Sequence, residues 1–96
     1  MQHVTLEQAR IMATQELEHL KSMVLTWKAS YQGMAGDEGD NDFLVLEFVQ
    51  EIEEYMVPFV RRMHVTEQLT DQQVSDFLDF CYMQAKDLRA SFNKEG

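Results

Sequence analysis

Two side chains that could bind a metal ion, Glu16 and His19, stand three residues apart in a stretch of helical character. Di-iron helical bundles present two ligands from one helix with this Glu-x-x-His spacing. A complete site would need a second such pair and two further carboxylates, but Arg61 stands three residues before His64. The leucines beside Glu16 and His19 are expected to face inward, which turns the pair towards solvent. We therefore expect no metal ligands here, and a metal-binding bundle is our third functional hypothesis.

A second set of possible ligands lies in the acidic segment 37–42, which contains three aspartates and one glutamate. Calcium prefers carboxylate oxygens of this kind. A calcium loop of the EF-hand type that ended at Glu47 would begin at Gly36, and Asn41 would stand where its sharp turn requires glycine. The spacing therefore favours an acidic loop that caps the following helix. Whether the segment binds a cation stays open at this stage.

Three glutamates, Glu47, Glu51 and Glu54, recur at helical spacing and should share one face of a helix. No lysine or arginine interrupts the acidic residues between Asp37 and Glu54. Carboxylates perform acid–base chemistry only where burial or neighbouring charges shift their pKa values. We expect the three to lie on the solvent-exposed outer face, opposite the apolar side of their helix. Such a surface could meet a basic partner or imitate the phosphates of DNA.

The remaining reactive side chains fit a structural role better than a catalytic one. Cys81 lies on the apolar face of a predicted helix, with no histidine at helical spacing to activate it. Trp27 and Tyr31 also follow an apolar helical pattern, which favours core packing over ligand stacking. The sequence has no glycine-rich phosphate loop, serine-centred nucleophile motif or zinc-ligand spacing. We expect no catalytic residue and no cofactor.

The strongest helical pattern spans residues 43–64 and should position the glutamates. Its apolar residues alternate between spacings of four and three, which places them on one stripe of a helix. The stripe comprises Val45, Val49, Ile52, Met56, Phe59 and Met63. Other apolar residues widen it on both sides, so this helix should have neighbours on more than one side. Pro58 removes a backbone hydrogen bond, and we favour a kinked continuous helix over two separate ones.

The first of two further helices is predicted over residues 6–32. Thr5 can cap its first turn and Gln8 can complete the capping box, whereas Gly33 is suited to end the helix. Its inner face should contain Ala13, Leu17, Leu20, Val24, Trp27 and Tyr31.

The last helix is predicted over residues 71–93, with Thr70 and Gln73 forming a second capping box. Its inner face should contain Val74, Leu78, Cys81, Ala85, Leu88 and Phe92. Because short loops join the three helices, we expect an all-α fold, an antiparallel three-helix bundle that forms a single domain over residues 1–96.

Composition narrows the functional class. The 96 residues are 45% apolar, which is typical of one folded domain, and they carry a formal charge of −9. This charge disfavours direct binding to nucleic acid or to anionic membranes, since both attract lysine and arginine. No apolar run is long enough to span a bilayer, and the first residues lack the core of a signal peptide. A single cysteine cannot form an internal disulfide, so we expect a cytoplasmic location.

Several large apolar residues fall outside the predicted inner faces and could bind a partner. On the last helix these are Phe77, Phe80 and Met83, and on the first helix Met12 and Met23. Phenylalanine and methionine are enriched at protein interfaces. We expect these five residues to form one face through which the chain makes a symmetric homodimer.

The sequence therefore predicts a small acidic helical module that regulates or binds other proteins, without catalytic activity, and that associates with itself. The main alternative is an acidic inhibitor or DNA mimic that acts on a nucleic-acid-binding protein.

Overall fold

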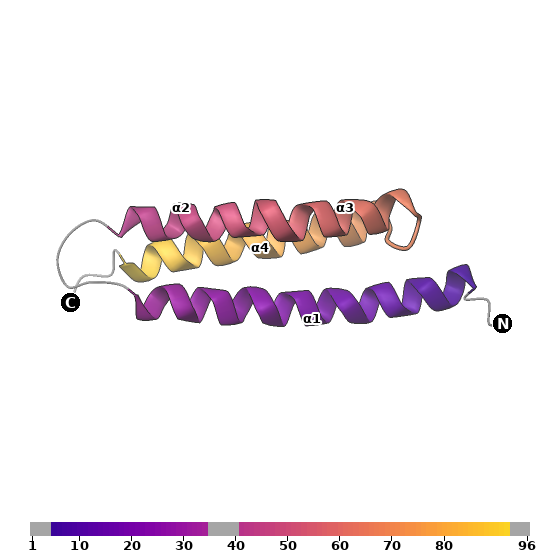
Figure 1. Ribbon diagram of the computed structural model, residues 1–96, viewed down its shortest axis with the longest axis horizontal. Helices are drawn as coiled ribbons and strands as arrows, with labels where there is room; N and C mark the ends of the chain where they lie inside the picture. The colour runs from indigo at the N-terminus through magenta and orange to yellow at the C-terminus, as the bar shows by residue number, and fades with distance from the viewer. Residues whose placement is uncertain (1–4, 35–40, 93–96) are drawn as a thin grey trace.

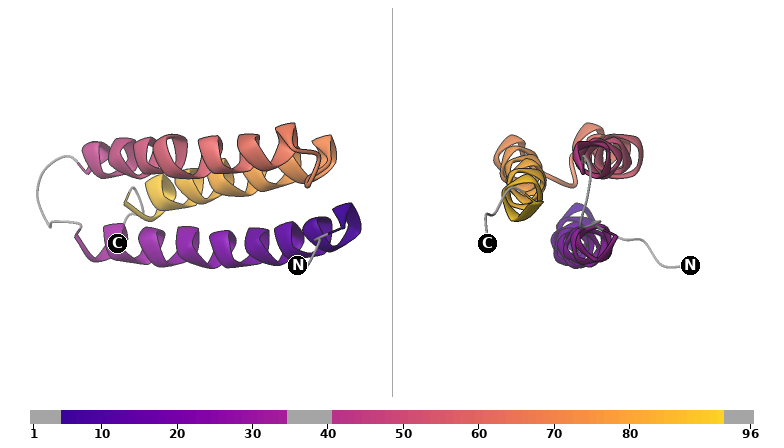
Figure 2. Two further views of the ribbon diagram at one scale, coloured as in Figure 1. Left: turned by 45° about the vertical axis from the view of Figure 1, so that its right-hand side comes forward. Right: turned by 90° about the vertical axis from the view of Figure 1, so that its left-hand side faces the viewer.

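The computed structural model describes residues 5–34 and 41–92. These residues form α1 (Leu6–Gly33), α2 (Asp42–Glu51), the π-helical turn η1 (Ile52–Met56), α3 (Val57–Val65) and α4 (Asp71–Phe92). Because α2, η1 and α3 continue one another, the described chain consists of three helical rods (Figure 1). Seen along their length, the rods stand at the corners of a triangle (Figure 2). The prediction of an all-α fold of three helices is confirmed.

Two capping boxes fix the starts of α1 and α4. The Gln8 backbone N–H donates to the Thr5 hydroxyl, and the Gln8 side chain accepts from the Thr5 N–H, both at 3.0 Å. Thr70 and Gln73 repeat this exchange at 3.1 and 2.9 Å. Both predicted caps are confirmed, and each satisfies two N–H groups that a helix start leaves unpaired. At the other end of α1, Gly33 is still helical and Met34 is the capping residue.

The irregularity expected at Pro58 takes the form of the π-helical turn just before it. In this turn the Val57 N–H donates to the carbonyl of Ile52, five residues back. Pro58 has no N–H to offer the carbonyl of Glu54, and its ring would crowd that carbonyl in a regular α-helix. A wider turn relieves the clash without ending the helix. The rod therefore passes through Pro58 without a break, as the apolar pattern indicated.

The π turn also changes which side chains of this rod face the core. One extra residue in a turn moves the inner stripe to a spacing of four, so Phe48, Ile52, Met56 and Val60 are buried in succession. Leu44, Val45 and Met63 complete the buried set. The prediction was wrong for Phe59, which is 38% exposed, and Val49 is only partly buried.

The inner face of α4 is rotated relative to the predicted one. Its buried residues are Phe77, Cys81, Gln84, Ala85 and Leu88, whereas Val74, Leu78 and Phe92 are only partly buried. A polar residue is tolerated on this face because Gln84 accepts a hydrogen bond of 3.0 Å from Lys28 Nζ of α1. Lys28 also pairs with Asp87, at 3.6 Å. An apolar pattern alone does not reveal this polar contact.

Contacts between the rods set their directions. At one end Arg10 donates to the Glu67 carbonyl just before α4, at 3.2 Å, and at the other end Lys28 reaches the second half of α4. These two contacts show that α1 and α4 are parallel to each other. The α2–η1–α3 rod runs in the opposite direction along the top of Figure 1, where α4 passes behind it, and Trp27 of α1 lies beside Tyr55 of η1.

The shifted stripe predicts unequal costs for two substitutions of the same kind on one rod. Phe48 is fully buried and Phe59 is partly exposed. Phe48→Ala should therefore lower the free energy of unfolding by about 3–5 kcal/mol, and Phe59→Ala by less than half as much. Urea denaturation of both variants measures the difference. A larger loss of unfolding free energy for Phe59→Ala than for Phe48→Ala would support the regular apolar stripe predicted from the sequence and would contradict the π turn.

Candidate functional site

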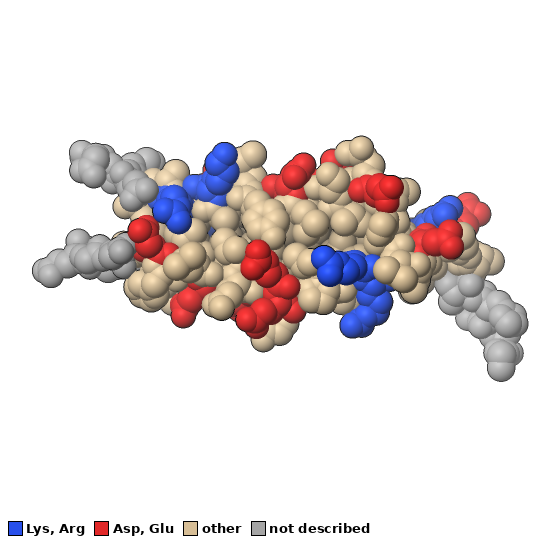
Figure 3. All heavy atoms as spheres, turned by 90° about the horizontal axis from the view of Figure 1, so that it is seen from above, with Lys and Arg blue, Asp and Glu red and all other residues tan. Residues whose placement is uncertain are grey.

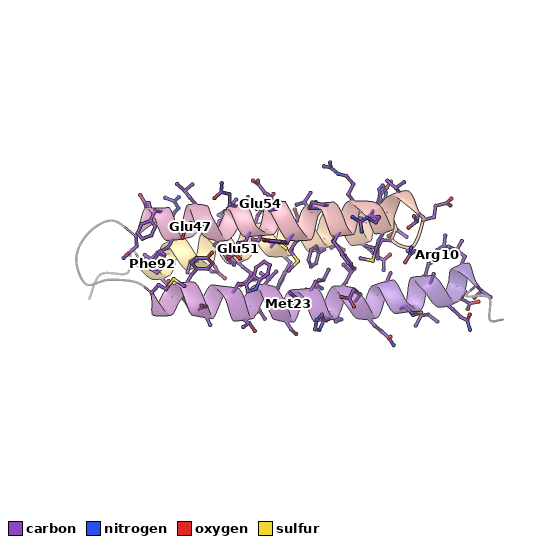
Figure 4. All side chains as sticks on the ribbon, in the orientation of Figure 1. Arg10, Met23, Glu47, Glu51, Glu54 and Phe92 are labelled. Carbon is purple, nitrogen blue, oxygen red and sulfur yellow. The ribbon has the colours of Figure 1, made fainter. Side chains whose placement is uncertain are left out.

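An apolar groove of about 300 Å³ lies between α1 and the η1–α3 part of the second rod. It is lined by Glu16, His19, Leu20, Met23, Trp27, Tyr55, Met56 and Phe59. Tyr55 is 62% exposed, so this lining combines a buried floor with accessible aromatic edges. Figure 4 looks onto this side of the molecule, with Met23 below the second rod. We call this surface the apolar groove.

A polar pocket of about 230 Å³ adjoins the apolar groove. Its lining residues are Tyr31, Glu47, Gln50, Glu51, Glu54 and Tyr55. Tyr55 belongs to both linings, so the two hollows meet at this side chain. We call the second hollow the acidic pocket. In Figure 4 Glu51 projects from the second rod towards α1.

Aromatic contacts hold the boundary between the two hollows. Trp27 and Tyr55 pack edge to face with ring centroids 6.3 Å apart, and Tyr31 packs against Phe48 in the same way at 5.7 Å. Such aromatic pairs add stability beyond the apolar area that they bury. They fix α1 against α2 and η1 and hold the shared Tyr55 ring in place.

The Tyr31 hydroxyl donates a hydrogen bond to Glu51 at the inner edge of the acidic pocket. Burial raises the pKa of Tyr31, and Glu51 and Glu47 raise it further because they disfavour a second negative charge. Tyr31 therefore remains a neutral donor, and Glu51 is tied to α1. Glu47 and Glu54 form no ion pair with any residue in 5–34 or 41–92.

Of the three glutamates expected on the outer face, Glu47 and Glu54 are exposed, whereas Glu51 is half-buried. All three line the acidic pocket, and Glu51 contacts Tyr31 on the neighbouring helix. The prediction that Glu47, Glu51 and Glu54 share one face is consistent with this arrangement, but the face is turned partly towards α1. Seen from the side of α2 and α3, acidic side chains gather near the middle of the surface, and basic side chains lie towards the α3 end and also near the opposite end (Figure 3).

The five residues predicted to form one partner-binding face do not lie together. Phe77 is fully buried in the core, and Phe80 lies beneath Lys21, whose Nζ is 5.7 Å from the ring centroid. Met23 lines the apolar groove on another side of α1. Met12 and Met83 are 59% and 53% exposed, but Met12 lies on α1 and Met83 on α4. Phe77, predicted to lie beside the inner face of α4 and to bind a partner, is instead part of that inner face, because the face is rotated relative to the prediction.

Glu16 is half-buried and His19 is exposed, and both lie at the edge of the apolar groove. No group of three or more histidine, cysteine, aspartate or glutamate side chains in the described ranges has the geometry to hold a metal ion. The candidate calcium segment 37–42 lies outside the described residues except for Asn41 and Asp42. The sequence did not indicate Tyr55 and Gln50 as site residues. Pro58 is its only sign of the π turn that positions Tyr55.

A further hollow of about 380 Å³ lies between α3 and α4, lined by His64, Asp71, Val74, Ser75, Leu78, Asp79 and Tyr82. A hydrogen bond between the His64 and Asp71 side chains, which both line it, joins the end of α3 to the start of α4. The Tyr82 hydroxyl donates to Glu53 of η1 at 3.3 Å. These contacts brace α4 against the second rod.

Cys81 is fully buried, as expected, and burial raises the pKa of its thiol to about 12. The charge of Lys21 acts in the opposite direction but does not offset burial. Since the thiolate is the nucleophilic form, Cys81 is not a nucleophile at neutral pH.

This raised pKa predicts a loss of stability in alkali. A thiol that stays neutral in the folded protein stabilises it fully below the unfolded-state pKa, and this contribution is lost as the pH rises above that value. Between pH 8 and 10 the free energy of unfolding should fall by about 1–2 kcal/mol more in the wild type than in Cys81→Ala. Chemical denaturation at each pH measures this. Identical pH dependence of the two proteins would show that the thiol ionises freely in the folded state.

In the part of the chain that the structure describes, no helix has both the length and the apolar character needed to cross a membrane. No protein-family model, curated protein or solved structure matches this chain. A functional proposal therefore rests on its own residues.

Proposed function

We propose that this protein is a non-catalytic interaction module that binds another protein through the apolar groove and the adjoining acidic pocket. The observation that carries the proposal is that the apolar groove and the acidic pocket share Tyr55. The two hollows therefore form one continuous surface with an apolar part and a charged part. Protein interfaces combine apolar anchoring sites with polar groups at their margin in this way. We place the module in the cytoplasm, because its one cysteine is a buried free thiol.

The residue types in the apolar groove support this role. Tryptophan, tyrosine, phenylalanine and methionine are enriched at interfaces, and tryptophan and tyrosine often dominate the binding energy. Trp27, Tyr55 and Phe59 lie close together at the groove, while Met23 and Met56 contribute flexible apolar surface. Packing within the chain buries these side chains only in part, since Tyr55 and Phe59 remain accessible to solvent.

A matched pair of variants tests the proposal in a pull-down from cell extract. Tyr55→Ala/Phe59→Ala removes two accessible rings from the apolar groove. Ile11→Ala/Leu25→Ala removes two exposed apolar side chains of α1 that line neither hollow. Proteins captured by the wild type should be retained by the second variant and lost with the first, as read by mass spectrometry. Equal capture by both variants would reject the groove as the binding surface.

A second candidate function is inhibition of a nucleic-acid-binding protein, with the carboxylates taking the place of phosphates. It is favoured by Glu47 and Glu54, which face a pocket without a basic partner in the described chain. In that case the captured protein should be released by added DNA or RNA, because both ligands would occupy one basic surface.

Self-association stays part of the proposal, with the exposed side of α4 around Met83 as its contact. Light scattering at tens of micromolar should then give twice the 11.3 kDa monomer mass. Met83→Glu should return the protein to the monomer, whereas Met12→Glu should not, because this equally exposed methionine lies on α1. A monomeric wild type would reject the dimer, and a dimeric Met83→Glu variant would reject this contact.

A further inference from the structure

We infer that the partner presents a basic amphipathic helix, which lies along the apolar groove as a fourth rod and directs lysine or arginine side chains into the acidic pocket. This inference rests on the proposed function and specifies the chemistry of its partner. Helix-in-groove binding normally uses apolar anchors one turn apart on the bound helix. Here the apolar groove would receive the anchors, and the acidic pocket would select the charge beside them.

The dimensions of the surface suit a short helix. Glu47 and Phe59 belong to one continuous rod, so they are separated by roughly 18 Å along its axis at about 1.5 Å per residue. A partner helix of about 12 residues therefore spans both hollows. The second rod has α1 and α4 as neighbours, and the groove beside α1 is where a further helix would bury Tyr55 and Phe59.

The charges specify a basic occupant. The two linings together contain Glu16, Glu47, Glu51 and Glu54 but no lysine or arginine. No metal-binding geometry occurs among the described residues, which favours the cationic side chain of a partner over a metal ion as the counter-charge. The Tyr55 ring, which lines both hollows, can also attract a cation.

A second copy of this chain suits the surface poorly. A two-fold axis that passed through the acidic pocket would set the same glutamates of both copies against one another, and like charges brought together repel. The basic residues Arg61 and Arg62 lie on α3, about two turns beyond Glu54. The partner helix should therefore carry its positive charges at the end that faces α2, and not along its whole length.

The test uses a peptide of about 16 leucine, alanine and lysine residues, with leucines at helical spacing and lysines in one half only. A second peptide has every lysine replaced by glutamine. Two further peptides reverse these patterns to cover both directions of binding. Trp27 is the only tryptophan in the chain, so its emission reports occupancy of the groove directly. The lysine peptide in one direction should shift this emission to shorter wavelength as Trp27 loses water.

Two charge-matched variants isolate the acidic pocket. Glu47→Gln/Glu54→Gln removes two carboxylates from it, while Glu7→Gln/Asp76→Asn removes two exposed carboxylates elsewhere on α1 and α4. The Kd of the lysine peptide should rise about five- to tenfold for the first variant and less than about twofold for the second. Glu51 is left in place because it accepts the Tyr31 hydrogen bond. Circular dichroism confirms that both variants keep their helices.

Other outcomes separate this inference from the proposed function. Equal Kd values for the two charge variants would overturn the inference, since binding would then follow net charge alone. Binding of the glutamine peptide as tight as that of the lysine peptide, and lost in Tyr55→Ala/Phe59→Ala, would overturn the basic partner but support the groove as a protein-binding site. Absence of any peptide-induced change in Trp27 emission would overturn the inference, while the pull-down with the groove variants still decides the proposed function.

Discussion

The backbone hydrogen bond that Pro58 cannot donate shapes the candidate site. A regular α-helix would force the proline ring against the Glu54 carbonyl, and the π turn avoids this contact by adding one residue to the turn. Everything beyond that turn is rotated. Val60 enters the core in place of Phe59, and Phe59 moves to the accessible edge beside Tyr55. The apolar groove is therefore a consequence of how the helix accommodates its proline.

Polar contacts complement this arrangement by holding α1 between its two neighbours. Towards α4, Lys28 bonds to Gln84 and Asp87, and Lys21 covers the ring of Phe80. Towards the second rod, the contacts are Tyr31 with Glu51 and Trp27 with Tyr55. The side of α1 that faces α4 is thus closed by long cationic side chains. The other side has aromatic rings and carboxylates, which leave accessible surface for a partner.

The sequence was sufficient for features set by local chemistry. Thr5 and Thr70 indicated where two helices begin, because a capping box is encoded within four residues. The sequence was insufficient for features that depend on contacts between residues far apart in the chain. The inner face of α4 includes Gln84 because Lys28 of α1 donates a hydrogen bond to it. The apolar pattern of α4 by itself gives no sign of this contact with another helix. The candidate site depends on a one-residue shift at η1, and a regular helical pattern has no means of showing it.

The methionine methyl groups offer the most direct test of the central claim, that a helix binds between α1 and the second rod. Met23 and Met56 line the apolar groove, whereas Met83 is exposed on α4. Methyl NMR spectra recorded during addition of the lysine peptide should show shifts of the Met23 and Met56 signals and an unchanged Met83 signal. Shifts confined to Met83, with Met23 and Met56 unmoved, would place binding on the outer side of α4 and contradict the account.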